Sequence, residues 1–194
     1  MCLLQPPMNE NPTPQNPQTA TECPQWYVLR FLYRDQPRVR EQFALDGIKA
    51  YTPVKPMVVT RNGRSIRMQV PIMWDLLFVR ATRSRLDPYV SAYPNLQYKY
   101  KTGGKYCEPI VVPERQMNDF IAAVESSEHP LYFAPDEIDL AKGTRVRIVG
   151  GPMNGRECVL LKVKGARSRR LIVEIPDTLY AAVEVSPDLI EIIK

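Results

Sequence analysis

The sequence predicts an α+β domain followed by a small all-β barrel. Three observations support this prediction. Residues 26–125 mix strand-like and helix-like patterns, residues 126–142 combine two prolines with several acidic residues, and residues 143–194 show strand patterns alone. Helices that pack on the face of a sheet are typical of α+β domains. About five short strands punctuated by Gly and Pro are typical of a small barrel. We therefore expect an N-terminal tail (1–25), an α+β domain (26–125), a linker (126–142) and a barrel (143–194).

The tail is compositionally distinct from the rest of the chain. Residues 1–25 contain six prolines, four glutamines and three asparagines, with almost no β-branched or aromatic residues. Such a segment cannot bury enough apolar surface to offset its ordering entropy, so we expect disorder there. The tail has a net charge of −2. Because the whole chain has a net charge of +5, the remaining residues carry +7. That excess mildly favours a polyanionic partner.

Composition excludes several classes of protein. No apolar run is long enough to span a bilayer, and no secretory signal pattern is present at the N-terminus. The cysteines have no CxxC or Cys/His spacing, so neither a zinc site nor a disulfide framework is expected. They are Cys2, Cys23, Cys107 and Cys158. Reduced thiols fit a cytoplasmic protein without a membrane anchor, and we expect a monomer.

The first half of the α+β domain has clear boundaries. An aromatic and β-branched run from Trp26 to Arg34 predicts a strand. A helix is predicted over residues 35–47, because Asp35 can cap it and Gly47 can end it. Strand patterns then flank the dipeptide Asn62-Gly63. Both residues of that dipeptide tolerate positive φ, which is a strong signal for a tight β-hairpin turn.

The second half of this domain ends in a helix. A short helix is expected near residues 85–92, and strand patterns return on both sides of Gly103-Gly104. Pro113 suits the first turn of a final helix. Its apolar residues recur at i, i+3, i+4 and i+7, which is the spacing of one helix face. They are Met117, Phe120, Ile121 and Val124.

The C-terminal segment has the alternation of half-buried strands. Val146 and Ile148 alternate with arginines, and a second alternating run follows at residues 171–175. Gly150 and Gly151 permit a tight turn where a side chain would clash. Gly155 is expected to lie in a second turn, before the next strand.

Taken together, these patterns resemble the NusG-type transcription elongation factors, over residues 26–193. The resemblance rests on the strand "WYV", the hairpin, the strand "LLFV", the closing helix and the segment "GTRVRIVGGPMNG" in this order. It implies an N-terminal NGN domain, an αβ sandwich with an antiparallel sheet, and a C-terminal SH3-like KOW barrel. The stretches "VPIMWDLLFVRATRSRL" and "PIVVPERQMNDFI" most resemble the UpxY antiterminators of capsular polysaccharide operons. One departure is Cys158, which stands where the KOW motif has a glycine.

The resemblance implies binding to the clamp helices of the RNA polymerase β′ subunit through an apolar patch. The matching strand is "PIMWDLLFV", which assigns the contact to Trp74, Leu76 and Phe78. Desolvated aromatic residues are frequent anchors of such interfaces. A plain core position is the alternative reading for Phe78, because apolar strand residues usually face the interior.

The resemblance also implies contact with the exposed non-template DNA strand, which requires basic side chains along the phosphates. Arg38 is the first candidate, and the others are Arg34, Arg40, Arg83 and Arg85. A solvated helix face is the alternative reading for these arginines. In the barrel, a loop with Arg167, Arg169 and Arg170 is a candidate surface for RNA or an acidic protein surface. The resemblance implies a ribosomal protein or a termination factor as the partner, and solvated charge is the alternative reading.

No pattern in the sequence indicates catalysis, a cofactor or a metal. The single histidine, His129, precedes a proline in the linker, and no nucleophile set accompanies it. Asp136, Glu137 and Asp139 form an acidic cluster that is more typical of a solvated linker than of a metal site. We therefore expect a non-enzymatic antitermination or elongation factor. The alternative is a ribosome- or RNA-binding KOW protein that does not act on polymerase.

Overall fold

The computed structural model describes residues 22–33, 36–103, 107–151 and 153–193. Within them, the α+β fold class is confirmed: antiparallel sheets are combined with three α-helices. The first sheet has the strand order β2-β5-β1-β6, and β7 also pairs with β1. Its strands are β1 (Gln25–Phe31), β2 (Lys49–Tyr51), β5 (Leu76–Ala81), β6 (Leu96–Tyr98) and β7 (Val111–Val112).

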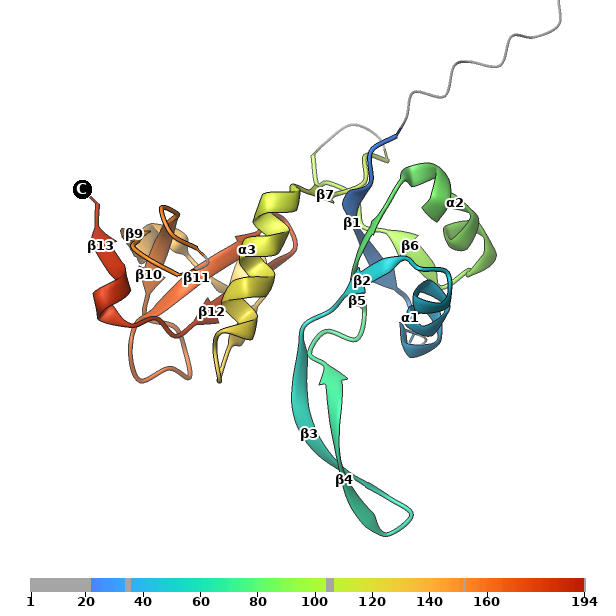
Figure 1. The fold of residues 1–194 in the computed structure, drawn as a ribbon, viewed down its shortest axis with the longest axis horizontal. Helices are drawn as coiled ribbons and strands as arrows, with labels where there is room; N and C mark the ends of the chain where they lie inside the picture. Colours follow the sequence, from blue (N-terminus) through green and yellow to red (C-terminus); the bar gives the residue numbers. More distant parts are fainter. Residues whose placement is uncertain (1–21, 34–35, 104–106, 152, 194) are drawn as a thin grey trace, which may run out of the picture.

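This sheet is covered on both faces. Trp26 and Val28 of β1 belong to one apolar cluster, whereas Tyr27 and Leu29 belong to another. Successive side chains of a strand point to opposite faces, so the two clusters lie on opposite sides of the sheet. One face packs against α1 (Gln36–Leu45) and α2 (Arg83–Ala92), and the other against α3 (Glu114–Glu125) (Figure 1).

The helix boundaries follow from local chemistry. Gly47 has φ of +65° directly after α1, so it ends that helix as predicted. The predicted cap at Asp35 lies outside the described residues. The helix expected at residues 85–92 begins two residues earlier, because the Thr82 side chain accepts a hydrogen bond from the Arg85 backbone N–H at 3.3 Å.

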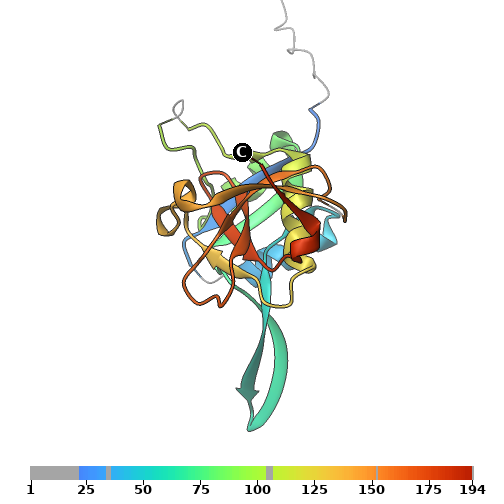
Figure 2. The same cartoon turned by 90° about the vertical axis from the view of Figure 1, so that its left-hand side faces the viewer.

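The hairpin predicted around Asn62-Gly63 is present, and it forms a separate two-stranded sheet. It consists of β3 (Val54–Arg61) and β4 (Arg64–Pro71), which pair antiparallel along their whole length. Asn62 and Gly63 have φ of 52° and 71°. Two central residues with positive φ are typical of a type I′ turn, whose twist suits a tight hairpin. The two strands project away from the rest of the chain (Figures 1 and 2).

The C-terminal half forms a six-stranded antiparallel sheet with the order β13-β9-β10-β11-β12-β8. Its strands are β8 (Leu131–Phe133), β9 (Thr144–Ile148), β10 (Glu157–Leu161), β11 (Arg170–Ile175), β12 (Leu179–Val183) and β13 (Ile190–Ile192). The strand patterns of residues 143–194 are thus confirmed. The recorded pairings form a path from β13 to β8, and none closes it into a barrel within the described residues.

The segment 126–142 differs from the expected linker. Leu131–Phe133 pairs with β12 as an edge strand, and two short 3₁₀ turns follow at Pro135–Glu137 and Leu140–Lys142. The tyrosine and phenylalanine of this strand supply apolar surface that the proline-based interpretation overlooked. The polypeptide between the two sheets is therefore largely part of the second one.

The glycine turns of the C-terminal half have the expected geometry. Gly150, Gly151 and Gly155 have φ of 92°, 69° and 77°. Such values favour glycine, because a Cβ is strained there. Cys158 needs no such conformation, since it lies within β10 opposite Val146 and its side chain is half-buried. The substitution of a glycine by this cysteine is therefore compatible with the strand.

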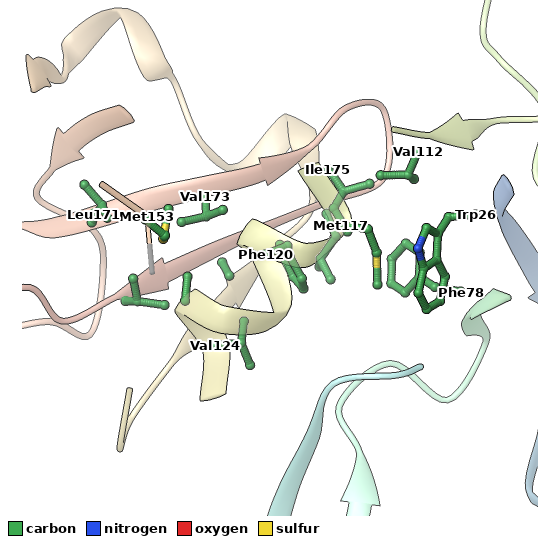
Figure 3. Packing of buried hydrophobic residues seen from close by; sticks show 14 of the residues in the cluster. Trp26, Phe78, Val112, Met117, Phe120, Val124, Met153, Leu171, Val173 and Ile175 are labelled. Atoms are coloured by element: carbon green, nitrogen blue, oxygen red, sulfur yellow. The ribbon is translucent and has the colours of Figure 1, made fainter. Parts of the chain in front are cut away.

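Helix α3 joins the two halves. Met117 and Phe120 belong to the cluster that includes Trp26 and Phe78 of the first sheet, and Val173 of the second sheet belongs to the same cluster. Figure 3 shows the α3 side chains between these two groups. The sequence left open whether the C-terminal half docks on the first domain, and in the structure it does.

Candidate functional site

The residues predicted to bind a protein partner occupy different environments. Phe78 and Leu76 lie in β5 and are buried, with 0% and 4% of their surface exposed, whereas Trp74 precedes the strand and is 42% exposed. Phe78 packs against Phe120 of α3, with ring centroids 6.4 Å apart. Phe78 and Leu76 are therefore core residues in this structure, and their own surfaces are not open to a partner.

Half-buried apolar side chains surround this core. Tyr51 of β2 lies with its ring centroid 6.5 Å from that of Phe78. Met73 and Ile121 also pack against the same cluster while retaining exposed surface. We call these three residues, together with the exposed Trp74 that follows Met73 in the chain, the Phe78 patch. The sequence did not predict Tyr51, Met73 and Ile121 as surface residues, although "PIMW" places Met73 beside Trp74.

Buried polar groups fix the strand under the patch. The Gln36 side chain donates a hydrogen bond to the Leu76 carbonyl at 2.7 Å, and the Thr52 hydroxyl donates to the same carbonyl at 3.2 Å. Both side chains are buried. A buried carbonyl with two donors is fully satisfied, so the start of β5 is held between α1 and the segment after β2.

The electrostatics of the patch are those of a partly desolvated apolar surface. Burial raises the pKa of Tyr51 above its ordinary value, and the nearby Tyr132 and Glu125 raise it further. Burial also raises the pKa of Tyr132, in β8, to about 12. Both hydroxyls therefore remain neutral at physiological pH. Next to the patch, Arg80 of β5 pairs with Glu114 of α3 at 2.7 Å.

The arginines predicted to contact nucleic acid gather on the opposite side of the sheet, on α1 and α2 (Figure 1). Arg38, Arg83 and Arg85 are exposed, and Arg40 is half-exposed. Arg34 lies outside the described residues. The structure thus brings the α1 pair and the α2 pair to one helical layer, which is separate from the Phe78 patch.

The α2 arginines also have structural roles. Arg83 pairs with Asp87 at 3.8 Å and lies over the Tyr98 ring. The Arg85 guanidinium donates a hydrogen bond to the Asp46 carbonyl, just after α1. The hydroxyl of Tyr89 donates to the carboxylate of Asp46 at 2.5 Å, which lowers the pKa of that carboxyl. These bonds tie the end of α1 to α2.

The predicted arginine cluster of the C-terminal half contains two exposed side chains and one buried side chain. Arg167 and Arg169 are exposed in the connection between β10 and β11. Arg170 is only 7% exposed, pairs with Glu184 at 2.6 Å and donates to the His129 carbonyl at 3.1 Å. Arg170 thus joins β11 to β12 and to the segment before β8, and it is not open to a partner as the sequence analysis expected.

Two acidic side chains between the two halves accept hydrogen bonds from nearby backbone N–H groups. The Glu137 carboxylate accepts the Ala134 N–H at 2.7 Å, and the Asp139 carboxylate accepts the Ala141 N–H at 3.1 Å. Asp139 also pairs with Lys142 at 3.3 Å. Across the residues that the structure describes, no group of three or more His, Cys, Asp or Glu side chains could hold a metal ion. Within the same residues, no helix is long and apolar enough to cross a membrane.

Comparisons with known proteins identify one family. Residues 24–139 match the model of the family described as "Transcription termination factor nusG". A solved structure entitled "Domain interaction in Thermotoga maritima NusG" is 18% identical, covers 88% of this chain and 98% of its own, and has a TM-score of 0.46. The structure entitled "Crystal Structure of MjSpt4:Spt5 complex conformation B" is 10% identical, with a TM-score of 0.26 and coverage of 87% and 96%. The search of curated proteins found no match.

Proposed function

The chain belongs to the NusG family of transcription factors, and we propose that it is a specialised antitermination or elongation factor that binds RNA polymerase through its first domain. The single observation that most supports this is the Phe78 patch. An apolar surface with an exposed tryptophan, built over a rigid aromatic core, has the composition of a protein-binding hot spot.

The proposed polymerase contact is made by Trp74 directly, with Phe78 and Leu76 acting beneath it. Trp74 is exposed, and Met73 beside it retains exposed surface. Phe78 would support the patch from the core, since its ring packs near those of Tyr51 and Phe120. The partner would be the clamp helices of the β′ subunit, as the resemblance to the family implies.

The proposed contact with the non-template DNA strand lies on the α1 and α2 layer. Arg38 remains the first candidate because its side chain is exposed on α1. Arg40 lies two residues further along the same helix, and Arg34 precedes it in the sequence. Arg83 and Arg85 would contribute charge from fixed positions, since they are held by Asp87 and by the Asp46 carbonyl. Phosphate contacts of this kind depend strongly on salt.

The C-terminal domain is proposed to recruit a ribosomal protein or a termination factor through Arg167 and Arg169. Both side chains are exposed on one loop, whereas Arg170 supports the strand behind them. The mechanism is a shift of populations: a factor bound across the polymerase cleft disfavours the open, paused state. Action at capsular polysaccharide operons, as for the UpxY subgroup, is the finer form of this proposal, with the cytoplasm as its location.

Binding to purified core polymerase tests the proposal. We expect Trp74→Ala to weaken binding at least about tenfold, the effect of losing one aromatic anchor. Tyr100→Ala is the matched control, because Tyr100 is 44% exposed against 42% for Trp74 but lies outside the patch. A wild-type protein that binds ribosomes and not polymerase would instead support the ribosome- or RNA-binding alternative.

A further inference from the structure

The hairpin of β3 and β4 has an unusual position for two strands. The two strands form a sheet of their own, and each is eight residues long. At about 3.3 Å per residue the ribbon extends roughly 26 Å. Figures 1 and 2 both show it reaching away from the sheets. An isolated two-stranded ribbon is only marginally stable in water, and a third strand or a packed face is usually needed.

One face of this ribbon is apolar. The pairing places Met57 opposite Met68 and Val59 opposite Ile66, and alternation puts these four side chains on the same face. Met57, Met68 and Ile66 are 44%, 45% and 43% exposed. The same pairing and alternation put Lys55 and Arg64 on this face, one near each end of the ribbon. We call these six residues the Met57 face.

The charge of this region has one sign. Residues 47–74 contain no Asp or Glu, whereas they contain Lys49, Lys55, Arg61, Arg64 and Arg67. These five cations equal the net charge of +5 of the whole chain. Positive charge beside an exposed apolar face favours a partner that supplies carboxylates around an apolar surface, because interfaces are arranged with complementary potentials. The ribbon is thus complementary to an acidic surface.

The apolar residues decide the class of partner. Residues 54–71 contain no aromatic side chain, so the ribbon has no platform on which the bases of a single strand could stack. Half to two-thirds of the hydrogen bonds between a protein and duplex DNA go to phosphates and sugars, which would leave most of the apolar surface of Met57, Ile66 and Met68 uncovered. Methionines, in contrast, adapt well to the irregular apolar surfaces of proteins. A protein partner therefore uses both features of the ribbon in full, whereas a nucleic acid uses mainly its charge.

We infer that the Met57 face docks on an apolar protein surface rimmed with carboxylates, carried by the transcribing RNA polymerase. The identity of that partner rests on the proposed function, but the ribbon is a second contact, separate from the Phe78 patch. Ile72 and Met73 connect β4 to Trp74, so both contacts can lie on one continuous surface. The charged ends of the face speed the encounter, and the apolar middle slows dissociation.

The test uses the full-length protein and reconstituted elongation complexes of core polymerase. Met57→Thr with Met68→Thr removes the apolar middle while keeping residues that favour strands. We expect this double variant to bind at least about tenfold more weakly. Val58→Thr is the matched control, since Val58 is 60% exposed on the same strand but its side chain lies on the other face. Lys55→Gln with Arg64→Gln should reduce the association rate, whereas Arg67→Gln on the opposite face should not.

A photocrosslinking experiment tests the same contact without the Met57 and Met68 substitutions, which could unfold the hairpin. Placed at Ile66 it should react with a polymerase subunit, and at the adjacent Ser65, on the other face, it should not. Unchanged binding of the Met57/Met68 variant, with wild-type binding intact, would overturn this inference and leave the proposed function standing. Crosslinks to DNA instead of protein would also overturn it. If the wild-type protein did not bind polymerase at all, both proposals would be wrong.

Discussion

The contact between the two halves of the protein contains an ion pair that can be tested by one charge reversal. Asp119 of α3 and Arg156, before β10, form an ion pair between the two halves. We expect Asp119→Arg to undock the C-terminal sheet from α3 while both halves stay folded. The reason is that Asp119 faces the second sheet, whereas Phe120 packs on Phe78 of the first one. Helix α3 also shares an apolar cluster with both sheets, which the repulsion has to overcome.

The size of the effect follows from burial and distance. The Asp119 and Arg156 side chains are only 20% and 24% exposed. Two unit charges at contact distance interact by about 4 kcal/mol at an effective dielectric constant near 20, and partial exposure reduces this value. Reversal therefore turns an attraction of roughly 2–4 kcal/mol into a comparable repulsion. Other polar contacts between the halves remain: the Gln116 side chain donates to the Glu174 carbonyl at 3.2 Å, and the Lys99 ammonium donates to the Asp177 carbonyl at 2.7 Å. A hydrogen bond of this kind is worth about 1 kcal/mol.

Two measurements detect undocking. The radius of gyration from small-angle X-ray scattering should increase, because the two halves would separate. Amide hydrogen exchange should become faster at the α3–β11 contact and remain slow in β1 and β5. The charge swap, Asp119→Arg with Arg156→Asp, should restore the compact form, since the pair is re-formed with opposite polarity.

Two results would refute this reasoning. If Asp119→Arg left both the radius and the exchange unchanged, the ion pair would contribute little to docking. If the charge swap failed to rescue, the loss would come from packing or helix effects and not from the charges. Loss of protection in β1 as well would show that the two halves fold as a single cooperative unit.

Three further predictions concern single side chains. Phe78→Ala should lower the free energy of unfolding by about 3–5 kcal/mol in urea titrations, because it empties a fully buried aromatic position; a loss below 1 kcal/mol would contradict the core assignment. Arg170→Met should cost about 1–3 kcal/mol by leaving the His129 carbonyl without its donor, whereas Arg167→Met, on the exposed loop, should leave the melting temperature unchanged. Burial raises the pKa of the Cys158 thiol to about 11, so at pH 8 mass spectrometry should find it alkylated far more slowly than the exposed Cys107. Since the proton stabilises the folded form here, this contribution to stability is present below pH 9 and is lost as the pH rises toward 11.

Local signals were sufficient for the elements with strong chemistry of their own. Asn62-Gly63 fixed the hairpin, because few dipeptides adopt positive φ twice in succession. Gly47 marked the end of α1, and the stripe of Met117, Phe120, Ile121 and Val124 marked α3. Each of these signals depends on residues that are close in sequence. They could therefore be interpreted without knowing what the element packs against.

The features that sequence analysis missed depend on contacts between distant residues. Helix α3 has a second face, formed by Gln116, Asp119, Ala123 and Ser126, which lies against the C-terminal sheet. Small and polar residues at this spacing look like a solvated surface, since nothing in the helix itself shows that a second sheet covers them. The same limit explains Arg170, which resembles its loop neighbours in sequence but is buried by Glu184.

Side chains of β1 and β5 alternate between the two faces of the sheet, and this alternation places the two proposed contacts on opposite faces. Trp26, Val28 and Phe78 point toward α3, whereas Tyr27 and Leu77 point toward α1 and α2. A protein surface bound at the Phe78 patch and a DNA strand bound along α1 would thus lie on opposite faces of one sheet. They would not compete for space, and a substitution on one face should leave affinity on the other unchanged unless it disturbs the strands between them. The shared strands make this independence testable: only a residue buried within β1 or β5 should weaken both.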